Sequence, residues 1–279
     1  MTIRFTKMHG LGNDFLVLDL RAQNVELTSE RILTWSDRHR GVGFDQLLIL
    51  EPATQAGVDF KYRIFNADAS EVEHCGNGAR CVARFAQRSL ESSQSDFVCE
   101  TARGLLTLSV LEDQQVKVAM GVPTFKPSEV PFVADDLALN YDLPLYANQS
   151  TQIKIGALAI GNPHAVHWVS ATATAPVDEL GPILESHPRF PNRVNVGFAE
   201  RVDQHQINLR VFERGVGETE ACGTGACAAA VHGMLTQGLV SPVSVHLPGG
   251  TLQIEWQGMG EQVIMTGPAT FVYDGELPD

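Results

Sequence analysis

Two cysteines stand directly before glycine-rich turns, and this setting is the strongest chemical signal in the sequence. Cys75 lies in HCGNGARC and Cys222 lies in ACGTGACA, so each thiol precedes a Gly-x-Gly pattern and then a helix-forming run. The thiolate is the reactive form of cysteine, and a helix N-terminus lowers the pKa of a thiol placed there. The outward N–H groups of such a turn also bind carboxylate or phosphate. Each element therefore combines a thiol that can act as an acid or base with a binding site for an anion.

The same element occurs twice because the chain is internally duplicated. At an offset of 147 residues (222 − 75), the matched pairs are Arg63 with Arg210, Phe65 with Phe212, Glu71 with Glu218, Glu73 with Glu220, Cys75 with Cys222, Gly76 with Gly223, Gly78 with Gly225, Ala79 with Ala226 and Ala83 with Ala230. Further matches are Gly12 and Asn13 with Gly161 and Asn162, and 119–125 with 265–271. Four matched segments in one order predict two lobes of one fold. We expect the lobes to pack about a pseudo-two-fold axis, with the active site in the cleft between them.

Two thiols in mirrored lobes suit the inversion of a carbon that bears hydrogen. One group must remove a proton from one face of that carbon, and a second group must deliver a proton to the other face. Fixed N–H donors in a dry cleft can stabilise the carbanion as it forms. The pattern therefore favours a two-base racemase or epimerase.

The sequence leaves other functions for cysteine to consider. Cys81, Cys99 and Cys227 lack the glycine context and are expected to be small buried hydrophobes. The C-x5-C and C-x4-C spacings that follow Cys75 and Cys222 are wider than the usual structural zinc pairs. A redox disulfide between Cys75 and Cys222 stays open, although the chain contains no C-x-x-C motif.

The elements that must position the thiols are mostly strands. Eight segments alternate or carry β-branched residues between turn residues: KYRIFNA, LLTLSVLE, VKVAMG, HAVHWV, INLRVFE, VSVHL, TLQIEW and QVIMTG. One helix per lobe is expected just after the CGxG element, at 79–89 and 225–235, and the second is apolar on nearly every side, as buried helices are. The pattern predicts an α+β fold with a curved sheet around a central helix in each lobe. Prolines at 127, 131 and 144 mark a looser segment.

Composition limits the partners and the compartment. The 279 residues are 44% hydrophobic and 19% charged, which is typical of a globular protein, and the net charge of −13 disfavours nucleic acid as a partner. No apolar run approaches the roughly 18–20 residues of a membrane span, and the N-terminal residues lack a signal-peptide core. We expect a cytoplasmic protein with reduced thiols and no membrane partner.

Four motifs resemble the signatures of the diaminopimelate epimerase family: MHGLGNDF (8–15), NADASEVEHCGNGARC (66–81), GNPHAV (161–166) and ERGVGETEACGTGACAAA (213–230). The resemblance runs from the first residues to GPATFVYDG near the C-terminus. It implies interconversion of LL- and meso-diaminopimelate without pyridoxal phosphate, metal or nucleotide, in the synthesis of lysine and peptidoglycan precursors. It also implies a homodimer, and two barrel-like lobes at 1–120, with 268–279 returning, and at 121–267.

The resemblance also implies roles for individual residues. Cys75 and Cys222 would be the acid/base pair, and His164 and Glu213 would tune their pKa values. The expected substrate contacts are Asn13, Gln46, Asn66, Gly76, Asn77, Asn162, Asn195, Glu213, Arg214, Gly223 and Thr224. Several of these match under the duplication, namely Asn13 with Asn162, Gln46 with Asn195, Asn66 with Glu213 and Asn77 with Thr224. The pocket implied by the family thus follows a repeat that was found independently.

Residue chemistry fits a substrate with an ammonium and a carboxylate at each end. Arg214 can bind the distal carboxylate through two parallel hydrogen bonds, and asparagine offers both a donor and an acceptor. The nearest alternative is a proline or hydroxyproline racemase, which would leave Arg214 without a distal carboxylate. A thiol redox or metal-binding protein would not use the asparagines, and an isomerase without thiol chemistry would not use the two cysteines.

Overall fold

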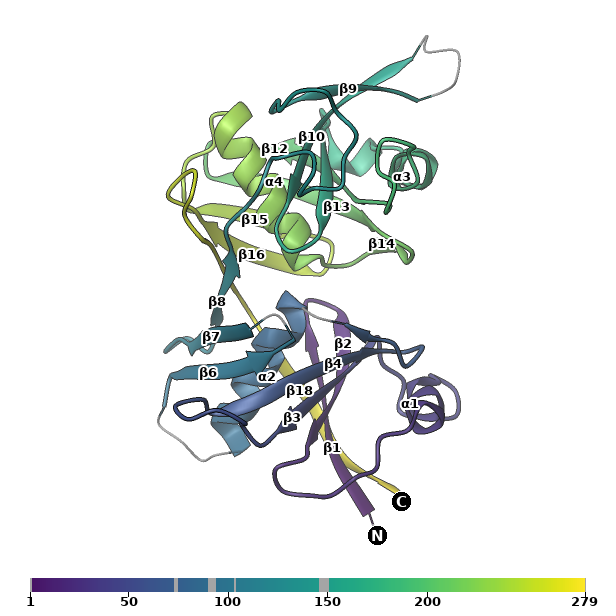
Figure 1. The fold of residues 1–279 in the computed structure, drawn as a ribbon, viewed down its shortest axis with the longest axis vertical. Helices are drawn as coiled ribbons and strands as arrows, with labels where there is room; N and C mark the ends of the chain where they lie inside the picture. Colours follow the sequence, from purple (N-terminus) through teal and green to yellow (C-terminus); the bar gives the residue numbers. More distant parts are fainter. Residues whose placement is uncertain (1, 73–74, 90–93, 103, 146–150, 279) are drawn as a thin grey trace. The chain divides into compact units, whose positions relative to one another are not determined.

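The chain folds into two compact units, each with its own sheet. Figure 1 shows the computed structural model, which describes residues 2–72, 75–89, 94–102, 104–145 and 151–278; Glu73 of the sequence repeat lies outside them. The first unit is Met1–Ala119 together with Thr266–Asp279, and the second is Met120–Met265. The chain passes between the units inside two strands, β8 (Val116–Gly121) and β17 (Val263–Gly267).

Strands dominate both units. Those of the first unit are β1 (Thr2–Gly10), β2 (Asn13–Asp19), β3 (Gln46–Glu51), β4 (Phe60–Asn66), β5 (Glu71–Val72), β6 (Asp96–Thr101), β7 (Gly104–Val110) and β18 (Thr270–Pro278), with helices α1 (Ser29–Ser36) and α2 (Gly76–Ser89). Those of the second are β9 (Tyr141–Pro144), β10 (Gln152–Ala159), β11 (Pro163–Trp168), β12 (Asn195–Arg201), β13 (Gln206–Glu213), β14 (Gly217–Thr219), β15 (Val243–Leu247) and β16 (Gly250–Glu255), with η1 (Thr172–Thr174), α3 (Val177–Glu185) and α4 (Gly223–Thr236). Each of the eight segments expected to be strands coincides with a strand to within two residues at its ends.

Both units have the same order of strand pairing. In the first, β1–β2 is antiparallel, β2–β3 parallel, β3–β4 and β4–β5 antiparallel, β4–β6 parallel and β6–β7 antiparallel. In the second, the pairs β10–β11, β11–β12, β12–β13, β13–β14, β13–β15 and β15–β16 repeat these directions in turn. The α+β class and the internal duplication predicted from the sequence are confirmed. The last strand, β18, pairs antiparallel with β1, so the C-terminus returns to the first unit.

One buried helix in each unit packs against the sheet of its own unit (Figure 1). The first eight residues of α2 are buried, and α4 is buried without a break over Gly223–Gly233. The expected buried helices are thus confirmed. At 14 residues, α4 is short, and in the described part of the chain no helix is both long and apolar enough to cross a membrane.

Both central helices begin earlier than the sequence suggested. The predicted starts were 79 and 225, whereas α2 begins at Gly76 and α4 at Gly223. The glycines form the first helical turn and not a separate loop, because the N–H of Ala79 already donates to the carbonyl of Cys75, and Ala226 to Cys222, at 2.9 Å each. Cys222 has extended backbone angles and is the N-cap of α4.

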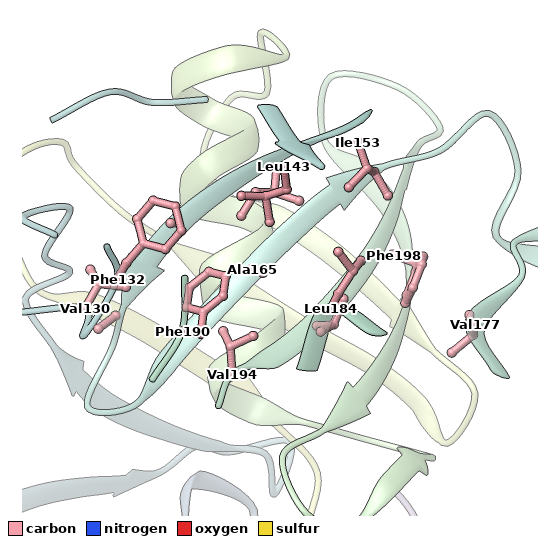
Figure 2. Close-up of a cluster of buried hydrophobic side chains, with 14 residues drawn as sticks. Val130, Phe132, Leu143, Ile153, Ala165, Val177, Leu184, Phe190, Val194 and Phe198 are labelled. Carbon is pink, nitrogen blue, oxygen red and sulfur yellow. The ribbon is translucent and has the colours of Figure 1, made fainter. Parts of the chain in front are cut away.

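The proline-containing segment contributes to the core of the second unit. Figure 2 shows Val130 and Phe132 among the buried side chains of this core, together with residues of β10, β11, α3 and β12. The ring of Phe132 lies 4.6 Å from that of Phe190 and 4.7 Å from that of Tyr141, measured between centroids. The backbone is irregular around Pro127 and Pro131, as expected, but Pro144 closes β9, and the rings of Phe132 and Tyr141 are held by aromatic packing.

Candidate active site

In the first unit, three amide side chains lie at one edge of the sheet. Asn13 opens β2, Gln46 opens β3 and Asn66 closes β4. Because β2 and β3 are parallel and β4 runs against β3, these three strand ends share one edge. Gln46 and Asn66 are partners in the ladder, and Nε2 of Gln46 donates to Oδ1 of Asn66 at 2.9 Å. The structure therefore brings these three predicted substrate contacts together.

Cys75 joins this row of amides at the start of α2. The N–H of Gly78 donates to Sγ of Cys75 at 3.4 Å, and the thiol lies 3.9 Å from Oδ1 of Asn13. The same oxygen accepts a hydrogen bond from Nδ2 of Asn77 at 3.3 Å. Cys75 is half-buried, whereas Asn77 is buried. The thiol, Asn13 and the first turn of α2, which includes Gly76 and Asn77, thus form one site.

An ionic cluster that the sequence analysis missed holds Asn13 in place. Oδ2 of Asp45 accepts from Nδ2 of Asn13 at 2.9 Å and from the N–H of Asp14 at 3.1 Å. Arg38 donates to both carboxylates, at 2.7 and 2.8 Å. Burial raises the pKa of Asp14, but hydrogen bonds from Arg38 and Lys7 outweigh it and lower the pKa to about 2. The sequence signal that could have indicated this cluster is Asp14, an acidic residue directly after Asn13.

The second unit repeats the arrangement with different residue types. Asn162 directly precedes β11, Asn195 opens β12 and Glu213 closes β13. Asn195 donates from Nδ2 to the carbonyl of Pro163 at 3.1 Å, and its Oδ1 accepts from the backbone N–H of Arg214 at 3.0 Å. Asn195 is therefore fixed between two strand ends.

Cys222 is more deeply buried than Cys75 and has an acidic neighbour. It is 4% exposed, and its sulfur lies 3.6 Å from Oγ1 of Thr224. Burial, and then the charge of Glu213, raise the pKa of Cys222 well above its ordinary value, and hydrogen bonds from Thr224 and the N–H of Gly225 oppose the rise. Glu213 itself accepts a hydrogen bond from Thr219 at 2.6 Å. This surrounding favours the protonated form of the thiol.

His164 is a neutral, buried histidine. It is 1% exposed, and burial, with a smaller effect of the charge on Arg214, lowers its pKa to about 3. Nε2 lies 2.8 Å from Oδ1 of Asn162, so this nitrogen carries the proton and donates it to the amide oxygen. The structure thus places His164 where it orients Asn162, and its predicted effect on a thiol stays a prediction.

Arg214 begins the turn between β13 and β14 and is exposed. Its Nη1 donates to the carbonyl of Asn192 at 3.2 Å. The next residue, Gly215, donates its N–H to Glu185 of α3 at 2.9 Å, and this buried carboxylate also accepts from Arg193 at 3.1 Å. Glu185 anchors the turn that carries Arg214, and sequence reasoning missed it because it belongs to a distant helix.

Matched ion pairs hold the short strand that precedes each of the two cysteines. Arg63 of β4 binds Glu71 of β5 through two hydrogen bonds of 2.7 and 2.9 Å, and Arg210 of β13 binds Glu218 of β14 through two of 2.6 and 2.8 Å. Both pairs follow the sequence duplication, since 210 − 63 and 218 − 71 are each 147. Each pair holds the short strand that precedes the cysteine against the long strand beside it.

The three remaining cysteines are buried, as predicted. Cys81, Cys99 and Cys227 are fully buried. Burial is the main cause that raises the pKa of Cys81 and of Cys99 to about 12 in each case. Within the described residues, no three His, Cys, Asp or Glu side chains gather as metal ligands.

A hollow of about 530 Å³ in the first unit lies apart from these residues. It is lined by β1, β18 and the end of α2, and none of the predicted site residues contributes to it. Its main charges are already engaged, because Arg88 pairs with Asp274, and Asp274 also accepts from Thr6. It is therefore a weaker candidate than the two cysteine sites.

Comparison with known proteins identifies a family. The family model described as diaminopimelate epimerase matches residues 5–126 and 156–272. A diaminopimelate epimerase of Pseudomonas entomophila (strain L48) is 54% identical over 277 residues, covering 99% of both chains. Another, of Ectopseudomonas mendocina (strain ymp), is 53% identical with the same coverage.

A solved structure shares the fold at low identity. A hydroxyproline epimerase from Agrobacterium vitis is similar with a TM-score of 0.69 and 16% identity, covering 99% of this chain and 92% of that one. At this identity the likeness concerns the fold alone, so it does not favour the racemase alternative. The full-length relatives do discriminate, and they favour the epimerase.

Proposed function

We propose that this chain, which belongs to the diaminopimelate epimerase family, interconverts LL- and meso-2,6-diaminopimelate by proton transfer at one α-carbon. The observation that carries the mechanism is the duplicated arrangement around Cys75 and Cys222. Each thiol stands at the start of a buried helix, and a polar side chain from the end of a strand lies near it, Asn13 at Cys75 and Glu213 at Cys222. The product is a precursor for lysine and peptidoglycan.

The polar groups match the charges of the substrate. The first-turn N–H groups of a helix have no intrahelical acceptor, so those of Gly76, Asn77, Gly223 and Thr224 suit the carboxylate at the reacting carbon. In the described residues, Oε1 of Gln46 is buried without a hydrogen-bond partner, and it can accept from a substrate ammonium. We assign the distal carboxylate to the Arg214 guanidinium, whose planar donors match a carboxylate.

The two thiols exchange one proton each per turnover. One cysteine, as thiolate, takes the α-proton and becomes a thiol, while the electron pair passes to the carbon and its carboxylate. The other cysteine, as thiol, gives its proton to the opposite face of the carbon and becomes a thiolate. This scheme requires both thiols to reach one α-carbon. The acidic neighbour and deep burial of Cys222 support its starting as the thiol.

Proton NMR in heavy water tests the reaction. The reduced protein is incubated with LL-diaminopimelate, and a parallel sample contains proline. We expect deuterium at one α-carbon together with meso product, since a thiol exchanges its proton with solvent. Exchange with proline and not with diaminopimelate would transfer the assignment to a racemase.

Cysteine variants test the mechanism separately from the substrate. Cys75→Ala and Cys222→Ala should each abolish formation of the product, because either the removal of the α-proton or the delivery of a proton to the opposite face then has no group to perform it. Cys227→Ala is the matched control, since Cys227 is a buried cysteine of the same helix as Gly223 and takes no part in the scheme. Product formation at the wild-type rate in either of the first two variants would overturn the two-base mechanism.

Family membership extends the proposal to the assembly. We propose that the chain acts as a cytoplasmic homodimer, without pyridoxal phosphate, metal or nucleotide. Sedimentation of the purified chain at micromolar concentration should give the mass of two copies. A stable monomer with full activity would contradict the dimer without affecting the proposed reaction.

A further inference from the structure

Glu185 is a buried carboxylate at the end of helix α3. It is 4% exposed, and a buried carboxylate is tolerated only where charged or polar donors surround it. Its Oε1 accepts from the N–H of Gly215 at 2.9 Å, and Nη1 of Arg193 donates to Oε1 and Oε2 at 3.1 and 3.3 Å. Figure 1 shows α3 beside β13 and β14, the two strands that the turn with Gly215 connects. One carboxylate therefore holds two loops together.

These two loops are the ones that fix Arg214. One of them carries Arg214 itself, directly before Gly215. The other supplies the carbonyl of Asn192, which accepts from Nη1 of Arg214 at 3.2 Å. Arg193, next to Asn192, has a left-handed backbone with a φ of 59°, which is uncommon for a residue other than glycine and persists only where its surroundings hold it. The ion pair with Glu185 is such a contact. Glu185 thus fixes both the backbone of Arg214 and the carbonyl that orients its guanidinium.

The first unit supports its matching turn with neutral groups. Under the duplication the residue that matches Arg214 is Ala67 (214 − 147), which has no charge to position. There the end of helix α1 contacts the turn through the hydroxyl of Ser36, which donates to the carbonyl of Ala67 at 3.0 Å. In the second unit the turn carries a guanidinium, and the end of the helix beside it carries the carboxylate of Glu185. The charged support therefore occurs in the unit whose turn carries the charged side chain.

We propose that Glu185 is a positioning residue that acts through Arg214 and determines the preference for a substrate with a second carboxylate. The inference deepens the proposed function and rests on it. A guanidinium binds a carboxylate through two parallel hydrogen bonds only when its plane is correctly oriented. An exposed arginine has many rotamers, and ordering them on binding reduces affinity unless the side chain is already held. Glu185 holds the loops on either side of this guanidinium, so the binding geometry exists before the substrate arrives.

A pair of ligands that differ only in the second carboxylate tests this assignment. Lysine has the chain of diaminopimelate with a hydrogen in place of that carboxylate. Glu185→Met keeps the length of the side chain and removes both acceptor oxygens. In this variant the KM for LL-diaminopimelate should rise about tenfold, with a change in kcat of no more than about twofold. The inhibition constant of lysine in the same assay should stay at the wild-type value, because lysine has no group for Arg214 to bind. General damage to the site would weaken both ligands alike.

Glu100→Met is the matched control for the loss of a buried carboxylate. Glu100 lies in β6, is 6% exposed, and accepts from the N–H groups of Thr54 at 2.9 Å and Gln55 at 2.8 Å, outside the candidate site. This variant should lower the melting temperature without changing KM. A measurement without substrate accompanies it, namely amide hydrogen exchange of the peptide that contains 214–217. Exchange should be faster than in the wild type in Glu185→Met and unchanged in Glu100→Met.

An unchanged KM for diaminopimelate in Glu185→Met, or an equal weakening of diaminopimelate and lysine, would overturn the proposal. Should this variant fail to fold, Glu185→Gln replaces it. A neutral amide oxygen is a weaker acceptor than a carboxylate, so KM should then rise about threefold with lysine unaffected, and an unchanged KM would again refute the assignment. A wild-type protein that does not incorporate deuterium into diaminopimelate would refute the proposed function instead. Even then, unchanged hydrogen exchange at 214–217 in the Glu185 variant would refute the support of this turn.

Discussion

Replacing Gly225 with alanine should separate catalysis from stability. Gly225 is in the first turn of α4, and a methyl group there would lie 3.2 Å from Sγ of Cys222 and 3.2 Å from Val211. These contacts are a few tenths of an ångström too close, so a neighbour must move. The sulfur is the freest of them, because rotation about one bond displaces it.

The expected magnitudes follow from two opposing terms. Alanine is up to about 1 kcal/mol better than glycine in a helix, which offsets the crowding, so the melting temperature should change little. Catalysis has no such compensation. A 1 Å displacement of a reacting group costs on the order of a hundredfold in rate, so a shift of a few tenths of an ångström should lower kcat roughly tenfold.

A double-mutant cycle isolates the contact with the sulfur. Thermal unfolding and deuterium incorporation are measured for the wild type, Gly225→Ala, Cys222→Ala and the double variant. Without the sulfur one close contact is removed and that with Val211 remains, so alanine at 225 should be less unfavourable to stability in the Cys222→Ala background than in the wild type. Wild-type kcat in Gly225→Ala, or equal effects of alanine at 225 in both backgrounds, would refute the reasoning.

Three further predictions concern pH and positioning. The pKa of His164 is about 3 in the folded chain and near 6.5 when unfolded. Its contribution to the free energy of unfolding is therefore complete above pH 6.5 and falls by about 1.4 kcal/mol per pH unit below that. Urea unfolding at pH 7 and pH 5 should show this loss, and His164→Asn should reduce the loss. Glu218→Gln should lower the free energy of unfolding by about 0.5–1 kcal/mol, and Glu71→Gln by less, because Glu71 is 44% exposed against 25%; equal losses in chemical denaturation would contradict the role of burial. Asp45→Ala should raise KM about fivefold through the loss of one hydrogen bond to Asn13, with a smaller change in kcat, and an unchanged KM would exclude the clamp.

The sequence was sufficient for the repeated parts of the fold. Alternation in segments such as KYRIFNA predicted β4, and the apolar run after Cys222 predicted a buried helix, because hydrophobic periodicity directly reflects which face is covered. The helix starts were placed two or three residues late. Glycine has poor helix propensity, so the sequence rule for turns outweighed the prediction of a helix, although burial stabilises the first turn of each helix.

The sequence predicted which residues form the site, but it did not predict the side chains that hold them in place. Asn13, Gln46 and Asn66 were predicted from their motifs, and strand order explains why they meet at one edge. Asp45 and Arg38 hold Asn13 in place, but no sequence spacing indicates which partner a charged residue will have in the fold.

By itself, the sequence determined the duplication, the two thiols at helix starts and the family, because each is a pattern of residue types along the chain. The tertiary structure decided what surrounds each thiol, because burial and the approach of distant strands are not local properties. It makes Cys222 a deeply buried thiol beside Glu213, and it turns the phenol of Tyr62 toward the helix of Cys75. Two copies of one motif thus acquire different electrostatic surroundings from side chains that the motif does not contain.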